Sequence, residues 1–499
     1  MEFKIKRGPL AGQKTPCLVL GVLEGKLKST QLQELDQLLG GRLARSFRSK
    51  EFTGAEGEKL FVHAGKDVPW ERLLLVGMGR DRDLSLSRLQ HISSAAARFL
   101  AEKKIGQFLM ALNQAPIKGS SLAQRVQSVG EGVLLADYRF DQYLNDEKRK
   151  KNLALTAVSF WLDSGEKRAE AEAAKEVARQ ICEGVCFARD LVNQPGNCKS
   201  PEYLARQAVQ MAEEVGIKAT LLERDELARE GFGGILGVAQ GSVRDPYLIV
   251  LEYHGGTEDA HPIALVGKGV VFDSGGISLK PSEKMDEMKM DMAGAAAVFG
   301  TMLSAARMKL PVNLVAVVPA VENMPSGNAI RPGDILTSLS GKTIEVLNTD
   351  AEGRLILADA LTYVGRYNPR VVIDLATLTG ACIIALGHHA SAVLGNHDGL
   401  IRQLLKAGER SGERLWQLPL WDEYSSMIKG DFADIKNTGG RPAGTITAAA
   451  FLQHFAEEYS WAHVDIAGTA WEEKGRPGCP KGGTGFGVRM LIEYLRGVE

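Results

Sequence analysis

The amino-acid sequence predicts an α/β protein of two domains, each built on a mostly parallel or mixed sheet flanked by helices. Three observations lead to this prediction. Short apolar runs rich in branched residues alternate with longer amphipathic stretches, as strands and helices do in α/β domains. A long, charged and Ala-rich segment divides this alternation into two parts. The length of 499 residues suits two domains, and also three, at about 100–200 residues per domain.

The first domain is expected over residues 1–165. Residues 1–7 lack the apolar core of a signal peptide and are typical of a first strand. This region shows no catalytic constellation. Further strands are expected at residues 17–22, 73–76, 108–112 and 155–162, with helices at 84–102 and 122–138.

A connecting helix and linker are expected over residues 166–195. The segment 166–193 is rich in Glu, Lys, Arg and Ala, which favour a helix. The run NQPGN at residues 193–197 then ends it with strong helix breakers.

The second domain is expected over residues 196–499 and should carry a two-metal site. Continuous apolar strands separated by helices predict a mostly parallel sheet covered on both faces. Ligand sites in such sheets lie at the carboxyl ends of the strands. Strands are expected at residues 263–273, 312–318, 371–375 and 463–467, and helices at 293–307, 354–364 and 486–496.

Composition favours a cytoplasmic enzyme with small substrates. The formal net charge of -1 gives no general attraction to nucleic acid or to anionic membranes. The most apolar run, residues 371–387, contains Asp374 and Gly380 and is short for a membrane span, which needs roughly 20 residues. Six cysteines in 499 residues are too sparse for a disulfide framework.

Three stretches of the second domain combine charged residues with glycines at strand ends or helix starts. They are GKGVVFDSGGISLK (residues 267–280), MKMDMAG (288–294) and NTDAEGRL (348–355). Glycine lets the backbone turn sharply and approach a ligand closely. Charges in such apolar surroundings are costly unless they are paired or bound to a cation.

The acids of these stretches predict a pair of divalent ions. Asp350 and Glu352 are two residues apart, so in an extended segment both carboxylates can reach one point. Asp273 ends an expected strand and Asp291 precedes an expected helix. Four converging carboxylates would raise one another's pKa values severely, and two dications would balance their charge. The sequence contains no HExxH and no CxxC as a competing metal motif.

Each piece also has a plainer explanation. A D-x-E sequence alone is usually a solvated turn, and single lysines such as Lys268 and Lys280 are most often surface charges. Two other functions stay open on the residues alone. A two-metal phosphoesterase would use similar carboxylates, but the sequence shows no P-loop or phosphate clamp. A nucleic-acid-binding or assembly protein finds slight support in the basic run KRKK at residues 148–151.

At these stretches the sequence resembles the leucyl aminopeptidase (cytosol aminopeptidase) family. The run NTDAEGRL is that family's specific signature, and VGKGVVFDSGGISLK (residues 266–280) and MKMDMAGAAAV (288–298) match in order and spacing. The likeness extends through ENMPSGNAIRPGDI (322–335), ATLTGA (376–381) and HVDIAGTAW (463–471). It covers residues 170–499, whereas the N-terminal region is similar only in α/β character and length.

The resemblance implies two divalent metal ions per subunit, Mn²⁺ or Zn²⁺. It implies that Asp273 and Glu352 bridge both ions and that Asp350 completes the more labile site. Lys268 and Asp291 would complete the tighter site. A lysine ligand must be neutral, and two nearby dications would lower its pKa enough for that.

The resemblance also implies a catalytic pair and a reaction. Lys280 would bind the substrate carbonyl and then its oxyanion, and Arg354 would hold a bicarbonate ion that acts as general base. The substrates would be peptides that lose their first residue, with a preference for leucine and other apolar side chains and broad tolerance. A homohexamer with central catalytic domains is also implied, with no membrane or nucleic-acid partner indicated. The expected substrate pocket comprises Met288, Asn348, Thr377, Gly380 and Ala467.

Overall fold

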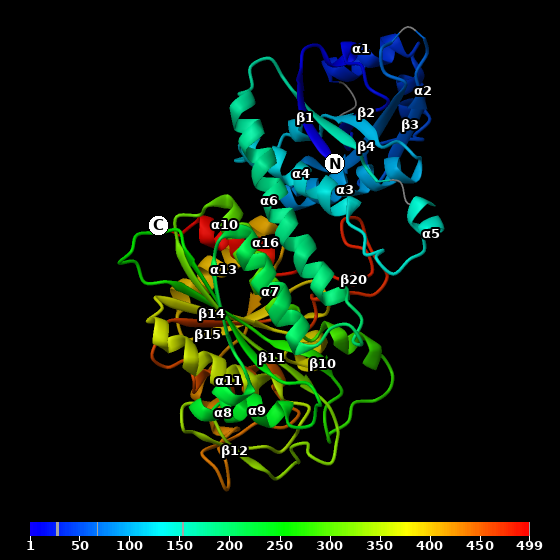
Figure 1. Cartoon of the computed structure of the whole chain (residues 1–499). Helices are drawn as coiled ribbons and strands as arrows, with labels where there is room; N and C mark the ends of the chain where they lie inside the picture. Colours follow the sequence, from blue (N-terminus) through cyan, green and yellow to red (C-terminus); the bar gives the residue numbers. More distant parts are fainter. Residues whose placement is uncertain (26–28, 67, 152–153, 499) are drawn as a thin grey trace. The chain divides into compact units, whose positions relative to one another are not determined.

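The computed structural model describes residues 1–25, 29–66, 68–151 and 154–498, and the side chains of residues 150 and 151 lie outside this description (Figure 1). The chain forms two compact units. Unit 1 comprises Met1–Cys182 and Gly475–Pro480, and unit 2 comprises Glu183–Lys474 and Lys481–Glu499. The helix expected over residues 166–193 is α6 (Arg168–Asn193), whose residues belong partly to each unit.

Unit 1 is built on a six-stranded sheet among its described residues, in the order β1-β6-β5-β2-β4-β3. Neighbouring strands are parallel, except that the edge strand β3 is antiparallel to β4. The mostly parallel sheet agrees with the predicted fold class. The strands are β1 (Glu2–Arg7), β2 (Leu18–Leu23), β3 (Lys59–His63), β4 (Arg72–Gly79), β5 (Gln107–Met110) and β6 (Ala157–Leu162).

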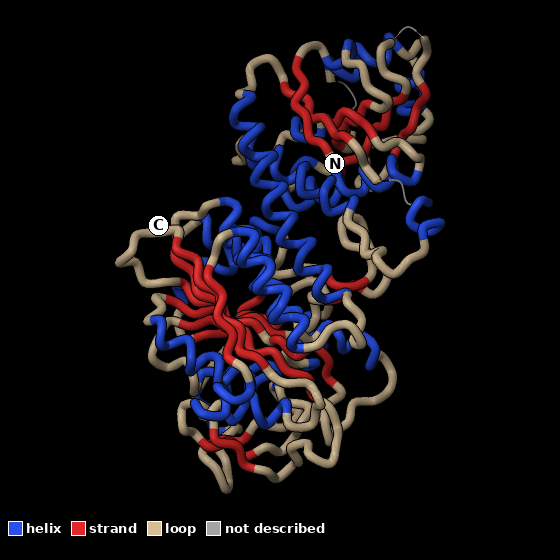
Figure 2. The backbone as a smooth tube through the Cα atoms, viewed as in Figure 1, coloured by secondary structure: helices blue, strands red, loops and turns tan. Residues whose placement is uncertain are grey.

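Helices flank this sheet (Figure 2). A hydrophobic core lies on each face of the sheet. One core includes side chains of α3, α4 and the start of α6, and the other includes side chains of α1 and α2. Ser121 begins α4 with a capping box that it forms with Gln124. The helices are α1 (Thr30–Leu38), α2 (Arg42–Arg48), α3 (Leu86–Glu102), α4 (Leu122–Asp137) and α5 (Asp146–Lys151).

Unit 2 contains the larger sheet, whose strand order is β16-β15-β18-β14-β9-β11-β8-β7, with β10 also paired to β11. Its centre, β18-β14-β9-β11, is parallel, and antiparallel strands lie on both sides. The sheet is therefore mixed with a parallel centre. Its strands are β7 (Lys218–Leu222), β8 (Tyr247–His254), β9 (Ile263–Gly267), β10 (Gly269–Asp273), β11 (Asn313–Asn323), β14 (Val371–Ala376), β15 (Ser391–Gly395), β16 (Leu415–Gln417) and β18 (Trp461–Asp465).

Helices cover both faces of the unit 2 sheet (Figure 2). Helices α7, α10, α13 and α16 lie on one face, and α9, α11 and α15 pack on the other around a large core. The helices are α7 (Pro201–Val215), α8 (Arg224–Glu230), α9 (Gly233–Ala239), α10 (Ala293–Met308), α11 (Gly353–Val364), α12 (Gly380–Leu386), α13 (Asp398–Ser411), α14 (Asp422–Ser426), α15 (Gly444–Gln453) and α16 (Val488–Arg496), with the 3-10 helices η4 (Met285–Met290) and η5 (Gly365–Tyr367). The short strands are β12 (Ile335–Thr337), β13 (Thr343–Glu345), β17 (Ile435–Lys436), β19 (Trp471–Glu472) and β20 (Gly482–Gly483).

The strand expected over residues 263–273 is interrupted at Lys268, which separates β9 from β10. Both strands pair in parallel with β11, and the register places Pro319 opposite Lys268. Proline has no backbone N–H to give to a ladder, which is consistent with the interruption. The Lys268 carbonyl accepts instead from Ala295 N at 2.9 Å, and its N–H donates to Leu375 O at 3.0 Å. The lysine is thus fixed between the sheet and the start of α10.

Candidate metal centre

The site lies where the central strands of the unit 2 sheet end. Asp273 is the last residue of β10, Lys268 follows β9, and Thr377 follows β14. Gly275 and Gly276 then turn the chain with φ of 88° and 67°, values that favour glycine. A Cβ on Gly276 would meet Asn323 Oδ1 at 2.8 Å, so the turn also has no room for a side chain. The carboxyl ends of the strands therefore carry the residues that the sequence singled out.

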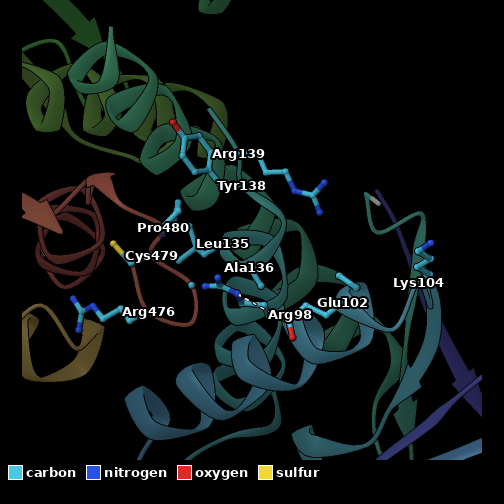
Figure 3. A pocket seen from close by; sticks show the side chains of 12 residues that line it. Arg98, Glu102, Lys104, Leu135, Ala136, Tyr138, Arg139, Arg476, Cys479 and Pro480 are labelled. Atoms are coloured by element: carbon cyan, nitrogen blue, oxygen red, sulfur yellow. Dashed lines mark ion pairs between the residues drawn. The ribbon is translucent and has the colours of Figure 1, made fainter. Parts of the chain in front are cut away.

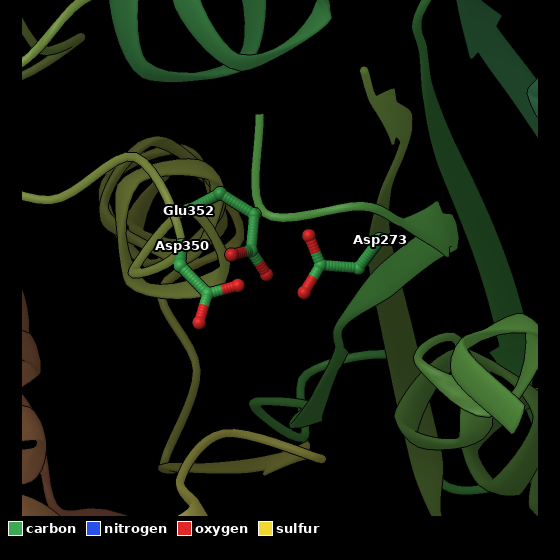
Figure 4. A group of neighbouring side chains, drawn as sticks. All are labelled: Asp273, Asp350 and Glu352. Atoms are coloured by element: carbon green, nitrogen blue, oxygen red, sulfur yellow. The ribbon is translucent and has the colours of Figure 1, made fainter. Parts of the chain in front are cut away.

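Three carboxylates converge at this position. Asp273, Asp350 and Glu352 each offer an oxygen, and these oxygens lie within 4.8 Å of one another. Figure 4 shows the three side chains pointing toward a common point, Asp273 from the end of β10 and the other two from the segment that precedes α11. Asp273 and Glu352 are buried and Asp350 is half-buried. Oxygen donors in this arrangement suit a divalent cation.

Asp350 and Glu352 do not converge through the alternation of an extended strand. Glu352 has helical backbone angles (φ −77°, ψ −36°) and directly precedes α11, while Asp350 lies in a turn. The start of a helix thus directs the Glu352 side chain toward the partner carboxylates. The N-terminus of that helix also favours the negative charge.

Lys268 occupies the interior of the acid cluster. Its ammonium group lies 2.8 Å from both Asp291 Oδ2 and Glu352 Oε1 and donates to Thr377 O at 2.9 Å. The side chain is only 3% exposed. Burial alone would lower the pKa of Lys268, but the carboxylates of Asp291, Glu352 and Asp273 raise it above its usual value. Coordination by Lys268 would therefore require a cation to displace this proton.

Asp291 joins the cluster from the short connection between η4 and α10. Its Oδ1 accepts from the Thr377 hydroxyl at 2.7 Å, and its Oδ2 faces Lys268. Burial raises the pKa of Asp291 well above its usual value, against the opposing effect of Lys268. Burial also raises the pKa of Glu352, and the Asp273 charge adds to that effect. Lys268 therefore compensates the charge of these two carboxyls only in part, as expected of a site that takes up a cation.

Lys280 lies at the more open edge of the cluster and is 21% exposed. Its ammonium group contacts Asp273 Oδ2 at 2.8 Å and Asp350 Oδ1 at 2.6 Å. Burial opposes the charge, but the nearby carboxylates hold the pKa of Lys280 above its usual value. Lys280 is therefore a cation that can face a ligand entering the site.

The charges and hydrogen bonds of these side chains fit the binding of divalent ions. The four carboxylates of Asp273, Asp291, Asp350 and Glu352 face two lysine ammonium groups, which leaves two negative charges in excess. Within the described part of the chain, the buried oxygen Glu352 Oε2 has no hydrogen-bond partner. A buried carboxylate oxygen without a partner is costly. A cation would remove this cost.

Arg354 is buried in the first turn of α11. Its Nη1 donates to Asn437 O at 2.8 Å, and its buried Nε has no hydrogen-bond partner among the described residues. Burial lowers the pKa of Arg354 to about 10, although Glu352 and Asp465 oppose the shift. An arginine with an open donor in a buried position is suited to a small planar anion.

Asn437, Asn323 and Thr349 support the site and were not identified from the sequence. Asn437 Nδ2 donates to Asn348 O at 2.7 Å, and its Oδ1 accepts from Leu347 N at 2.9 Å. Asn323 Nδ2 donates to Asp273 Oδ1 at 2.8 Å and to Thr349 O at 3.1 Å. The Thr349 hydroxyl donates to Gly275 O at 2.7 Å. Asn323 lies in the stretch ENMPSGNAIRPGDI (residues 322–335), and Thr349 lies in NTDAEGRL (348–355). Asn437 has no sequence signal except that it begins the turn-forming run NTGG.

The five expected pocket residues occupy different elements of unit 2. Thr377 contacts both Asp291 and Lys268, and Asn348 Oδ1 accepts from Asp350 N at 2.9 Å. Met288 lies in η4, Gly380 is the exposed first residue of α12, and Ala467 follows β18. Thr377 and Asn348 are thus in contact with the acid cluster, and the grouping of all five as a pocket stays a prediction.

Two cavities lie among the described residues of unit 1. One of about 340 Å³ is lined by Arg98 and Glu102 of α3, Tyr138 and Arg139 after α4, and Arg476 (Figure 3). The other, of about 780 Å³, lies beside the carboxyl ends of the adjacent strands β2 and β5. No group of three or more acid, histidine or cysteine ligands was found among the described residues of unit 1.

The basic run at residues 148–151 lies at the end of unit 1's α5, where Lys148 and Arg149 are exposed. The side chains of Lys150 and Lys151 lie outside the described residues. Among the helices that the structure describes, none combines the length and the apolar character needed to cross a bilayer.

Comparison with known proteins gives matches along nearly the whole chain. The model of the "Cytosol aminopeptidase family, catalytic domain" matches residues 186–492, and that of the family's N-terminal domain matches residues 19–147. A probable cytosol aminopeptidase of Syntrophotalea carbinolica is 60% identical over 99% of both chains, and one of a Geobacter species is 51% identical over 99% of this chain and 100% of the relative.

Solved structures give the same picture. A mutant of tomato leucine aminopeptidase is similar with a TM-score of 0.89 and 32% identity, over 99% of this chain and 96% of the other. The bottromycin maturation enzyme BotP in complex with Mn is similar with a TM-score of 0.84 and 33% identity, over 96% of this chain and 99% of the other.

Proposed function

The chain belongs to the cytosol aminopeptidase family, and we propose that this aminopeptidase requires two divalent metal ions and prefers leucine and other apolar residues at the N-terminus of its peptide substrates. The observation that carries the proposal is the convergence of Asp273, Asp350 and Glu352 around one point. The Mn complex of the structural neighbour BotP gives independent support for a metal requirement. The family name supports the cytoplasm as its location.

Five residues would hold the two ions. Asp273 and Glu352, the buried members of the converging group, would be ligands of both ions. Asp350, which is half-buried, would complete the more exchangeable site. Lys268 and Asp291 would complete the tighter site from the interior. When bound, the ions would polarise the scissile carbonyl, lower the pKa of the attacking water and bind the free α-amine of the substrate.

Lys280 and Arg354 would act on the reacting groups directly. The Lys280 ammonium, held between Asp273 and Asp350, would donate to the scissile carbonyl oxygen and stabilise the negative charge that develops on it. Arg354 would bind a bicarbonate ion through its open Nε, and bicarbonate would supply the general base. The backbone contact from Arg354 to Asn437 fixes the direction of the guanidinium group.

Substrate preference would depend on Met288, Thr377, Gly380 and Ala467, with Asn348 at the edge nearest Asp350. An apolar pocket discriminates by only about 1–3 kcal/mol per methylene, so broad tolerance is expected. We also propose the homohexamer that the family resemblance implies. Its substrates would be peptides.

The test is metal content measured together with activity. Protein treated with a chelator should hydrolyse leucine p-nitroanilide only after Mn²⁺ or Zn²⁺ is restored, and elemental analysis should find two ions per chain. Glu352→Gln should reduce both the rate of hydrolysis and the number of bound ions per chain. Asp359→Asn is the matched control, because Asp359 is a buried acid on the same helix whose oxygens accept from Leu339 N and Ile235 N instead.

Two results would reject the proposal. One is full activity in a strong chelator with no bound metal. The other is hydrolysis of an aryl phosphate, tested in parallel with the same metal, at a higher rate than the arylamide.

A further inference from the structure

The 3-10 helix η4 carries Met288 and leads directly into Asp291, yet its described residues include no buried side chain. Its three methionines are only half-buried, so hydrophobic packing holds η4 less firmly than the helices of the core. Polar contacts also hold it, and two lysines supply them. These two lysines are not those of the acid cluster, Lys268 and Lys280.

Lys199 makes the first contact. It is fully buried between the end of α6 and η4, and its Nζ donates to Leu191 O at 3.1 Å, Val192 O at 2.9 Å and Lys289 O at 2.5 Å. The first two carbonyls belong to the last turn of α6, where carbonyls lack intrahelical partners and carry partial negative charge. Three carbonyl acceptors match the three N–H groups of an ammonium ion.

Lys289 makes the second contact in the opposite direction. Its carbonyl accepts from Lys199, while its own Nζ reaches back to Asn193 O at 3.1 Å. The same ammonium group lies over the Trp471 ring, 5.7 Å from the ring centre. One residue of η4 is thus tied to the end of α6 through both its backbone and its side chain.

The end of α6 is itself fixed by β20. Gly483 N donates to Asn193 Oδ1 at 2.8 Å, and a Cβ on Gly483 would meet Val192 Cβ at 2.7 Å. Trp471, which lies beneath Lys289, is the strand partner of Gly483. The end of α6, β19–β20 and η4 therefore form one closed set of contacts.

Burying an ammonium ion without a carboxylate partner is costly. Burial, together with the Lys289 charge, lowers the pKa of Lys199 well below its usual value. Stability alone would be served better by an apolar residue. The amine finds its hydrogen-bond partners only when η4 and the end of α6 are in place, so Lys199 links the position of η4 to that of α6.

We propose that Lys199 and Lys289 form a lysine clamp that positions η4, so that Asp291 reaches Lys268 and Thr377 in the correct geometry. The clamp residues are positioning residues, since neither touches the acid cluster. The expected effect on metal affinity rests on the proposed function, in which Asp291 is a metal ligand. The expected effect on the position of η4 does not depend on that function.

Hydrogen–deuterium exchange of the metal-free protein tests the clamp. In Lys199→Met and Lys289→Met, peptides covering residues 281–292 should exchange at least about tenfold faster than in the wild type, because η4 opens locally. Lys342→Met is the matched control. Lys342 also donates to a helix-end carbonyl, His454 O at 2.7 Å, and also lies over an aromatic ring, that of Phe455, but it has no link to η4.

The second measurement is calorimetric titration of the same variants with Mn²⁺. Both clamp variants should bind more weakly by about 10–100-fold, the usual effect of losing a residue that supports a metal ligand, and Lys342→Met should match the wild type. Unchanged exchange in residues 281–292 of Lys289→Met would overturn the clamp, whatever happens to Lys199→Met. If the wild type bound no metal, the proposed function would fail, while the exchange results would still decide on the clamp.

Discussion

Gly353→Ala offers a sharp test of the site, because two physical effects predict opposite outcomes. Gly353 is the first residue of α11, where alanine would improve helix propensity by at most about 1 kcal/mol. However, an added Cβ would lie 2.6 Å from Lys268 Cε and 2.7 Å from Lys268 Nζ. Lys268 cannot move freely, since its ammonium group is held by Asp291, Glu352 and Thr377.

The structure indicates which effect is larger. Lys268 Nζ would have to withdraw by at least about 0.7 Å to restore an ordinary contact of 3.4 Å. Overpacking of this kind costs about 1–3 kcal/mol, and weakening a buried ion pair adds to that cost. We therefore expect net destabilisation of unit 2 by about 1–3 kcal/mol. A displacement approaching 1 Å should also reduce turnover by about a hundredfold.

Gly365→Ala is the matched control at the other end of the same helix. Gly365 has φ −57°, and an added Cβ would meet only Tyr459 Cε1 at 3.9 Å. That substitution should leave turnover and Mn²⁺ affinity unchanged and stability equal or slightly higher. The assays are urea unfolding of the metal-free proteins, Mn²⁺ titration and hydrolysis of leucine p-nitroanilide. Wild-type behaviour of Gly353→Ala in all three would refute the placement of Lys268 in the acid cluster.

Further predictions concern catalysis, support and pH. Lys280→Ala should lower kcat for leucine p-nitroanilide by about 10²–10³-fold while Mn²⁺ remains bound. Arg354→Ala should lower kcat by about 10²-fold, with partial rescue by added bicarbonate in a rate assay, and unchanged turnover in both variants would remove these roles. Asn437→Ala should weaken Mn²⁺ binding in calorimetry by about tenfold, because the Asn348 carbonyl loses its donor. Burial raises the pKa of Asp359 to about 7, which means that folding favours the protonated carboxyl. The stability that this carboxyl contributes is therefore full below about pH 4 and is lost as the pH rises through about 7. Asp359→Asn should flatten that part of the stability profile in urea unfolding, and an unchanged slope would contradict the assignment.

Much of the fold could be predicted because the relevant signals are local. The strands β4 and β14 are short apolar runs, and α3, α4 and α10 are continuous apolar or amphipathic stretches. Helices α1 and α2 and strand β3 were not predicted, nor were the elements between residues 196 and 262. Helices α2, α8 and α9 are only seven residues long, and tertiary packing decides the structure of such short segments. Helix α7 and strand β8, in contrast, carry an amphipathic and an apolar pattern that sequence reasoning could have used.

The site residues could be named from the sequence, but their geometry could not. The convergence of Asp350 and Glu352 was expected from an extended strand, whereas Glu352 has helical backbone angles. Asn437 was missed because its partners, Leu347 and Asn348, lie some ninety residues away. Polar contacts between residues so far apart in the sequence leave no periodic pattern in it. Only the folded topology brings such residues together.

The single residue between β9 and β10 fixes the spacing of this segment on its two sides. Side chains alternate between the faces of a strand, so inserting one residue beside Lys268 would turn Gly269 and Val270 to the opposite faces. The pairing of β10 with β11 is itself irregular between Val270 and Asp273, so the orientation of Asp273 depends on that irregularity as well as on the length of the strand. Protein engineers who graft or recombine this strand would therefore have to transfer Lys268, β10 and Asp273 as one piece.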